Sequence, residues 1–212
     1  MKNKEKMIDE IIKLHITTNH TGKMTGMQSL STSCKTNPNC MKYSKVEGSI
    51  CSHCYAQSMM KMYKNMSPCY ERNADILTTR VLDKEELPLI NACYFRFEAF
   101  GDLNNTTQLI NYFNICKKNP DVHFALWTKN PFIVKEVADQ KPKNLVILVS
   151  SLFLNKPINI ENMPYIDKVF TVYDKETIEK ENININCGAR SCLKCHRCYK
   201  KGGAKYVNEK LK

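Results

Sequence analysis

Downstream of Pro88 the hydrophobic pattern alternates between two periods. Short apolar runs rich in β-branched and aromatic residues recur at roughly even spacing, and the segments between them carry apolar residues at the 3.6-residue period of amphipathic helices. The expected strands cover residues 92–97, 122–127, 145–149 and 168–173, and the expected helices cover 106–118, 131–140 and 175–181.

This alternation predicts an α/β fold built from βαβ units, with a parallel sheet or barrel and right-handed crossovers. The run LVILV at residues 145–149 is apolar without alternation, as expected for a strand covered on both faces.

The N-terminal part is less regular. The apolar spacing predicts a helix over residues 2–16, a strand within 22–32, and helices over 55–66 and 70–82, with Pro68 suited to a helix start. A cysteine-bearing loop covers 34–54. We expect residues 1–184 to form the main domain, 185–201 a knuckle held by metal ligands, and 202–212 (GGAKYVNEKLK) a mobile basic tail.

Composition narrows the class of protein. A length of 212 residues suits one sizeable domain with a small appendage. With 42% hydrophobic and 25% charged residues the protein should fold, which excludes disordered and fibrous proteins. It contains no apolar run long enough to span a bilayer and no apolar leader, so we expect a cytoplasmic protein with no membrane partner.

Charge and cysteine content suggest what the protein binds. The net charge of +11 is compatible with a nucleic-acid partner, or with a solvated basic surface that reflects a Lys, Asn and Ile bias. Eleven cysteines in a reducing cytoplasm favour metal or redox chemistry over disulfides.

The first cysteine group comprises Cys34, Cys40, Cys51 and Cys54, spaced C-x5-C-x10-C-x2-C. Three close thiolates beside the carboxyl edge of a sheet can hold a [4Fe–4S] cluster with one open iron. A structural zinc loop is the alternative. Cys34 is either a fourth ligand or a spectator, and His53 either replaces a cysteine ligand or packs beside the cluster.

The second group comprises Cys187, Cys192, Cys195 and Cys198, spaced C-x4-C-x2-C-x2-C. Three cysteines at two-residue intervals are typical of bacterial ferredoxins, whereas zinc sites more often use two separated C-x2-C pairs. This spacing favours an iron–sulfur cluster, with zinc as the alternative.

Polar residues collect where the predicted strands end, which is where parallel sheets bind ligands. Gly101 permits a turn or close approach to a ligand, and Asp102 either hydrogen-bonds a cofactor or caps the next helix. Lys129 could neutralise a carboxylate or phosphate. Arg96 and Glu98 should share one face, and if that face is buried they should be paired. The candidate cofactor-binding residues are Glu98, Gly101, Asp102, Lys129 and Ser150.

Five segments in order carry a resemblance to a known family. They are ICSHCYAQ (50–57), YKNMSPCYERNADIL (63–77), FRFEAFGDL (95–103), FALWTKNP (124–131) and the C-terminal cysteine-rich knuckle. Together, from Asn19 to Tyr199, they resemble the gene product eighty-eight family of bacteriophages and mobile genomes.

More remotely, the architecture resembles that of radical S-adenosylmethionine enzymes. This resemblance implies a partial (β/α) barrel in which Cys40, Cys51 and Cys54 hold the cluster, His53 is the aromatic residue before the last ligand, and Gly101-Asp102 meets the methionine end of S-adenosylmethionine. Two departures from the common pattern are present: the cysteine spacing is C-x10-C-x2-C instead of C-x3-C-x2-C, and Gly-Asp replaces Gly-Gly-Glu.

The implied activity is the formation of a 5′-deoxyadenosyl radical that takes hydrogen from an unknown small-molecule substrate. An electron donor protein would serve the cluster, and the C-terminal group would hold an auxiliary cluster or a structural metal. Two other functions stay open. One is a zinc-stabilised nucleic-acid-binding or phage–host interaction protein. The other is a [4Fe–4S] enzyme that uses an open iron without S-adenosylmethionine.

Overall fold

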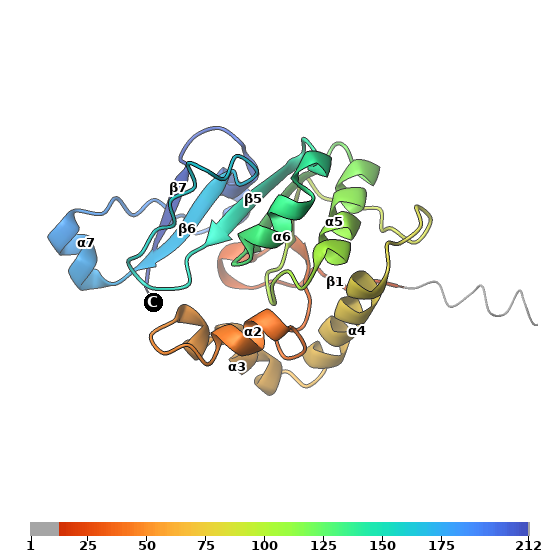
Figure 1. The fold of residues 1–212 in the computed structure, drawn as a ribbon, viewed down its shortest axis with the longest axis horizontal. Helices are drawn as coiled ribbons and strands as arrows, with labels where there is room; N and C mark the ends of the chain where they lie inside the picture. The colour runs from red at the N-terminus through yellow and green to blue at the C-terminus, as the bar shows by residue number, and fades with distance from the viewer. Residues whose placement is uncertain (1–12, 212) are drawn as a thin grey trace, which may run out of the picture.

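A seven-stranded sheet organises the protein, as the computed structural model shows for residues 13–211 (Figure 1). The strands lie side by side in sequence order. β1 is antiparallel to β2, and every pair from β2 to β7 is parallel. The strands are β1 (Ile16–Thr17), β2 (Gln28–Leu30), β3 (Tyr94–Phe97), β4 (His123–Thr128), β5 (Leu145–Ser150), β6 (Lys168–Tyr173) and β7 (Tyr206–Lys210).

Helices occupy most of the connections between these strands. The α-helices are α2 (Pro38–Tyr43), α3 (Tyr55–Met62), α4 (Met66–Thr79), α5 (Thr106–Lys118), α6 (Pro131–Glu136), α7 (Lys175–Glu181) and α8 (Cys192–Cys195). Short 3-10 turns are η1 (Gly22–Met24), η2 (Ile50–His53), η3 (Ala138–Gln140) and η4 (Arg197–Tyr199).

The predicted α/β class is confirmed, and the pattern after Pro88 was the most reliable guide. α5, β6 and α7 have the predicted bounds. α5 and α7 begin at capping side chains, since Asn105 accepts a hydrogen bond from Gln108 N and Asp174 from Thr177 N. The helix expected over 131–140 ends at Glu136 and continues as η3.

The sheet runs through β2 to β7 without any reversal of strand order. In a doubly wound sheet the strand order reverses and helices cover both faces. In a singly wound sheet, like that of a (β/α) barrel, the strand order does not reverse and the crossover helices cover one face. Among the described residues β1 and β7 do not pair with each other, so this sheet is open.

The two faces of the sheet carry different cores. The outer face, under α4, α5 and α6, is apolar and includes Phe95, Phe97, Leu126, Ile147 and Val169. The inner face carries the alternate residues. Its buried core comprises Met27, Ala125, Val146, Leu148 and Val207, together with Tyr199 from the C-terminal cysteine segment.

An ion pair joins η1 to β7 over the inner face. Lys23, which precedes β2, places Nζ 2.7 Å from Oε1 of Glu209 in β7. Lys23 belongs to η1, five residues before β2 begins at Gln28. The segment before β2 and strand β7 therefore meet over this face.

The predicted mobile tail is wrong for residues 206–210, because these residues form β7. β7 pairs with β6 over Val169–Tyr206 through Tyr173–Lys210, and Val207 is only 1% exposed. The segment YVNEK has one strongly apolar residue facing the core, which gave too weak a period for a strand to be recognised.

We expect Val207→Ala to lower the free energy of unfolding by about 2 kcal/mol, because a fully buried valine leaves a cavity when truncated. Urea denaturation measures this change. Val81→Ala is the control, since Val81 is 47% exposed and its truncation should have little effect. Equal small effects at both positions would contradict the packing of β7.

The N-terminal predictions met with mixed outcomes. Most of the helix expected over 2–16 lies outside the described residues, and its end forms β1. The strand expected within 22–32 is limited to β2. The loop expected over 34–54 contains α2 and η2, because Asn37 caps a helix that begins at Pro38 by accepting hydrogen bonds from Asn39 N and Cys40 N.

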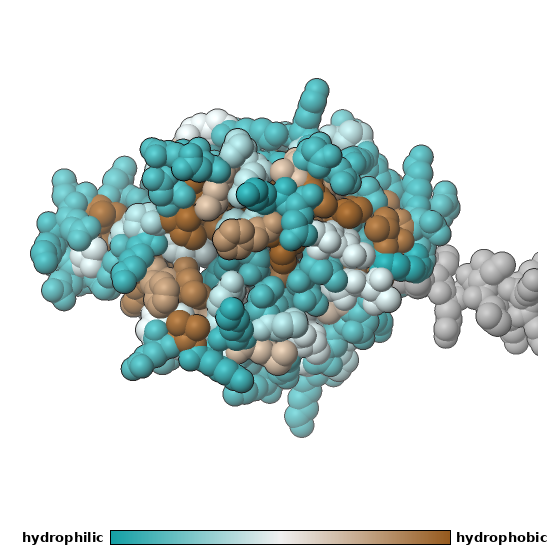
Figure 2. Space-filling model, viewed as in Figure 1, coloured by the Kyte–Doolittle hydropathy of each residue, from teal (hydrophilic) through white to brown (hydrophobic). Residues whose placement is uncertain are grey.

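The surface seen in Figure 2 is mostly hydrophilic, with separate hydrophobic patches. Among the helices of residues 13–211, none combines the length and apolarity needed to cross a membrane.

Candidate functional site

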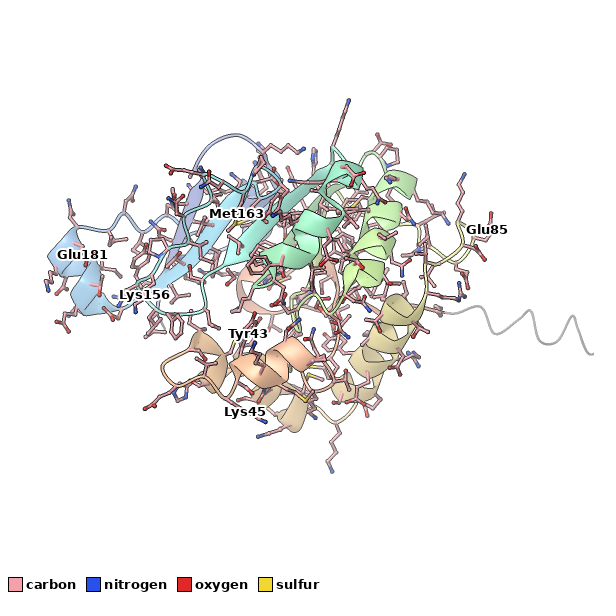
Figure 3. All side chains as sticks on the ribbon, viewed as in Figure 1. Tyr43, Lys45, Glu85, Lys156, Met163 and Glu181 are labelled. Carbon is pink, nitrogen blue, oxygen red and sulfur yellow. The ribbon has the colours of Figure 1, made fainter. Side chains whose placement is uncertain are left out.

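The cysteine loop of residues 34–54 lies at the carboxyl ends of the parallel strands. It follows β2 and is hydrogen-bonded to the segments after the next three strands. Asn37 Nδ2 donates to Asp102 O (2.7 Å), Tyr43 Oη to Asn130 Oδ1 (3.0 Å) and Ile50 N to Leu152 O (2.8 Å). In Figure 3 Tyr43 lies on the side of α2 that faces the sheet. This placement agrees with the expected position beside the carboxyl edge.

The thiols of this loop gather around a small apolar cluster. Cys34 is 1% exposed and packs with Ala56, Met60 and Tyr70, and Cys40 and Cys54 contact the same cluster. Cys34 Sγ lies 3.4 Å from Met60 Sδ. Burial raises the pKa of Cys40, and negative charge on Asp102, Glu98 and the neighbouring thiols raises it further.

Cys54 is the thiol best placed to ionise. It is the N-cap residue of α3. A hydrogen bond from the Cys34 thiol, together with the N–H groups of Ala56 and Gln57, lowers the pKa of Cys54 to about 6. The same interaction raises the pKa of Cys34. Thiolates are the metal-binding form of cysteine, so Cys54 is ready for coordination at neutral pH.

The thiols of the cysteine loop are close to one another but are not arranged around a common metal position. Within residues 13–211 no three side chains of His, Cys, Asp or Glu are arranged to hold a metal ion. The cysteines lie close enough to affect one another's pKa values.

Glu98 is buried against α5, so the prediction that it shares one face of its strand with Arg96 is wrong, since Arg96 stacks on Trp127 of the inner-face core. Its carboxylate is 3% exposed and accepts hydrogen bonds from Thr32 N and Oγ1, from Gln108 Nε2 (2.6 Å) and from Tyr112 Oη (2.5 Å). Burial raises its pKa to about 8. Protein donors therefore occupy the carboxyl group, which joins the start of the cysteine loop to α5.

Gly101 and Asp102 build the turn after β3. Gly101 has a φ of +82°, and a Cβ on it would lie 2.5 Å from Thr32 O. Asp102 Oδ1 accepts hydrogen bonds from Leu103 N (2.7 Å) and Thr128 Oγ1 (2.6 Å), and Oδ2 accepts one from Lys129 N (3.0 Å). The glycine is thus required by close packing on Thr32, and the aspartate fixes the end of β4.

Lys129 and Ser150 face the cysteine loop from the ends of β4 and β5. The Lys129 ammonium lies 3.5 Å from Ser150 Oγ and has no carboxylate partner in an ion pair within the described residues. Its positive charge acts to lower the pKa of Cys51, although burial raises that pKa overall, and it contributes to the lowered pKa of Cys54. Lys129 therefore places a positive charge beside Cys51 and Cys54.

Several residues of this region were not identified from the sequence. They include Thr32, Gln108 and Tyr112, which hold Glu98, and Tyr55, whose hydroxyl donates to Ala99 O (2.6 Å). Gln108 and Tyr112 are four residues apart on α5 and both are fully buried. Two polar side chains at that spacing on the buried face of a helix were the available signal, because buried polar groups need partners.

Comparison with known proteins identifies one family. The family model described as Gene product 88 matches residues 2–210, nearly the whole sequence. No curated protein and no solved structure matches it.

Proposed function

We propose that this protein, which belongs to the gene product 88 family, is an iron–sulfur enzyme in which Cys40, Cys51 and Cys54 hold a [4Fe–4S] cluster. One observation carries the proposal. The cysteine loop follows the first parallel strand and is hydrogen-bonded across the carboxyl ends of the next three strands. Ligands of singly wound parallel sheets bind at this edge.

The sheet supports a partial (β/α) barrel as the scaffold. Six parallel strands follow one another in sequence order, and α4, α5 and α6 cover one face. The Lys23–Glu209 ion pair joins η1 to β7 over the inner face. This arrangement resembles the partial barrel of radical S-adenosylmethionine enzymes, which also have a cysteine loop after the first strand.

The residues present fit a cluster with one unliganded iron. Cys40, Cys51 and Cys54 are half-buried, whereas Cys34 is enclosed against Met60. Three of the four thiols can therefore reach a ligand between the loop and the strand ends. A bound cluster would supply a Lewis-acidic iron and a one-electron reduction, for which an electron donor protein would be the partner.

The protein's own residues suit a zwitterionic cofactor such as S-adenosylmethionine. The Lys129 ammonium, close to Cys51 and Cys54, would pair with a carboxylate, and Ser150 would donate a second hydrogen bond. Asp102 holds the backbone of Lys129 in place. Glu98 has no capacity left for the cofactor, and its part is to fix Thr32 at the start of the loop.

Anaerobic purification tests the cluster. We expect about four iron and four sulfide per protein molecule at this site, with brown colour. Cys51→Ala should lose this iron, because three thiolates are the minimum that the proposal requires. Cys69→Ala is the matched control, since Cys69 contacts the same apolar cluster and is not a proposed ligand. Parent protein without acid-labile sulfide, or Cys51→Ala protein with the same iron content as its parent, would contradict the proposal.

The cofactor is tested separately. Under reductant, the protein with S-adenosylmethionine should form 5′-deoxyadenosine, and Lys129→Met should weaken cofactor binding. A loaded cluster with no 5′-deoxyadenosine would favour an enzyme that uses its open iron otherwise. A zinc protein with salt-sensitive RNA or DNA binding would favour the nucleic-acid alternative.

A further inference from the structure

The second cysteine group lies on the opposite side of the sheet from α4, α5 and α6. Cys187, Cys192 and Cys198 pack against the inner-face core, which includes Ala125, Val146 and Leu148. Burial raises the pKa of Cys198 to about 12, and negative charge on Cys187, Cys192 and Cys195 contributes. The packing of Cys187, Cys192 and Cys198 on one core cluster brings these thiols to the same region, and Cys195 ends the short helix α8 that begins at Cys192. They lie in the crossover between β6 and β7, whereas the first group lies between β2 and β3.

Two aromatic anchors hold this segment in place. The ring of His196 stacks on Tyr94 with centroids 5.3 Å apart, and Tyr199 is 4% exposed and contacts Tyr94 and Trp127 edge-on. His196 has a φ of +38°, a conformation that a residue without glycine's freedom adopts only where its surroundings impose it. The contacts of His196 and Tyr199 with the aromatic side chains of the sheet thus fix the turn between Cys195 and Cys198.

The inner face also holds a cation with no anionic partner. The Arg96 guanidinium carbon lies 4.0 Å from the centre of the Trp127 ring, and Nη1 lies 3.4 Å from Met24 Sδ. Arg96 Nε is buried and has no acceptor among the described residues. No carboxylate in the described range forms an ion pair with Arg96. Arg96 is half-buried, and its buried Nε–H group is left without an acceptor, which costs free energy.

A second cation, Lys23, contacts the second cysteine group, but its charge is already paired with that of Glu209. Lys23 Nζ lies 2.9 Å from Cys187 O and 3.9 Å from Cys187 Sγ. Glu209 pairs with it at 2.7 Å. Lys168 Nζ, near Cys198, donates to Gly202 O and Ala204 O, whereas Arg96 Nε has no acceptor among the described residues. Arg96 also acts to lower the pKa values of Cys192 and Cys198, although burial raises both overall.

We propose that Cys187, Cys192, Cys195 and Cys198 form a second, fully thiolate-ligated metal centre, and that Arg96 is its counter-cation. Four thiolates around Zn²⁺ or an oxidised [4Fe–4S] core leave a net charge of minus two. That charge supplies the partner that Arg96 lacks. Because all four ligands come from the protein, the centre binds no substrate, and it fastens the β6–β7 crossover to the inner face.

Metal retention in a Cys51→Ala background tests the centre, because that change separates it from the proposed catalytic cluster. We expect the Cys51→Ala protein to retain either one zinc or about four iron with four sulfide. Further replacement of Cys195 by serine should abolish this retention. Colour and sulfide content distinguish the cluster from zinc. A Cys51→Ala protein that holds no metal, or retention that survives Cys195→Ser, would overturn the site.

The role of Arg96 is tested by the rate at which a chelator removes the metal. In the same background Arg96→Gln should release metal roughly 10-fold faster, the size of effect usual for groups that support metal ligands. Arg96→Lys keeps the charge and should fall between Arg96→Gln and the parent. Arg72→Gln removes an exposed arginine on α4 and should change nothing. Equal release rates for Arg96→Gln and its parent would refute the counter-cation. If Arg96→Gln failed to fold, Arg96→Met would take its place, and a release rate equal to that of Arg72→Gln would refute the counter-cation.

Discussion

Gly101→Ala is expected to destabilise the protein by about 3 kcal/mol or more, which lowers the melting temperature by roughly 10 °C. The new Cβ would lie 2.5 Å from Thr32 O and 2.7 Å from Glu98 Oε2. Thr32 cannot move away freely, because its N–H and hydroxyl hold the Glu98 carboxylate. The left-handed φ of +82° adds strain for any residue with a Cβ. Thermal denaturation measures the effect.

Two other glycines separate these causes. A Cβ at Gly22, with a φ of +62°, meets nothing within 4 Å, so Gly22→Ala reports conformational strain alone, roughly 1 kcal/mol. Gly202 has open space and no left-handed φ, so Gly202→Ala should stay within about 0.5 kcal/mol of the parent. If Gly101→Ala were no worse than Gly22→Ala, the packing of the turn on Thr32 would be wrong. Lower metal content in Gly101→Ala should accompany the instability, since Thr32 leads into the cysteine loop.

Glu98→Gln is expected to change how stability depends on pH. Burial raises the pKa of Glu98 from its ordinary 4.5 to about 8 in the folded protein. Between these values the folded state keeps a proton that the unfolded state has lost. The stabilisation is complete below about pH 4.5 and disappears as pH rises to about 8, a change on the order of 4 kcal/mol. Glutamine does not titrate, so this slope should vanish.

The variant should also carry a constant penalty of about 1–3 kcal/mol, because an amide NH₂ in place of one carboxylate oxygen meets the Thr32 N–H. The variant should therefore be about 1–3 kcal/mol less stable than the parent near pH 5 and more stable than the parent at pH 8.5, because by then the parent has lost more than that penalty. Urea denaturation across this range measures it. Glu85→Gln, at an exposed position, removes the same charge and should follow the parent. Parallel curves for Glu98→Gln and parent would show that Glu98 titrates normally.

The sequence predicted the elements whose hydrophobic period was long and whose ends carried caps. α5 illustrates this, since thirteen residues of helical pattern follow the capping Asn105. The order of the βα units also predicted which loops would meet, and Asp102, Lys129 and the cysteine loop do converge at the strand ends.

What the sequence could not predict depended on contacts between distant residues. Strand β7 is short and owes its place to pairing with β6, which no local pattern reveals. The partners of Glu98 come from the segment after β2 and from α5. The alternation that placed Glu98 on the face of Arg96 ends at Phe97, the last residue of β3, and Glu98 has a φ of +54°. Arg96 faces the other way and stacks on Trp127. Where a strand ends and which partners a side chain meets are tertiary properties that local alternation does not reveal.

The Lys23–Glu209 ion pair joins residues 186 positions apart in the sequence. Parallel sheets with such distant contacts fold slowly, since a long segment must be ordered before the contact forms. During synthesis β6 keeps an unpaired edge until residues 206–210 have been translated and β7 has paired with it. A protein truncated before Tyr206 would therefore expose the β6 edge and should aggregate more readily than the parent.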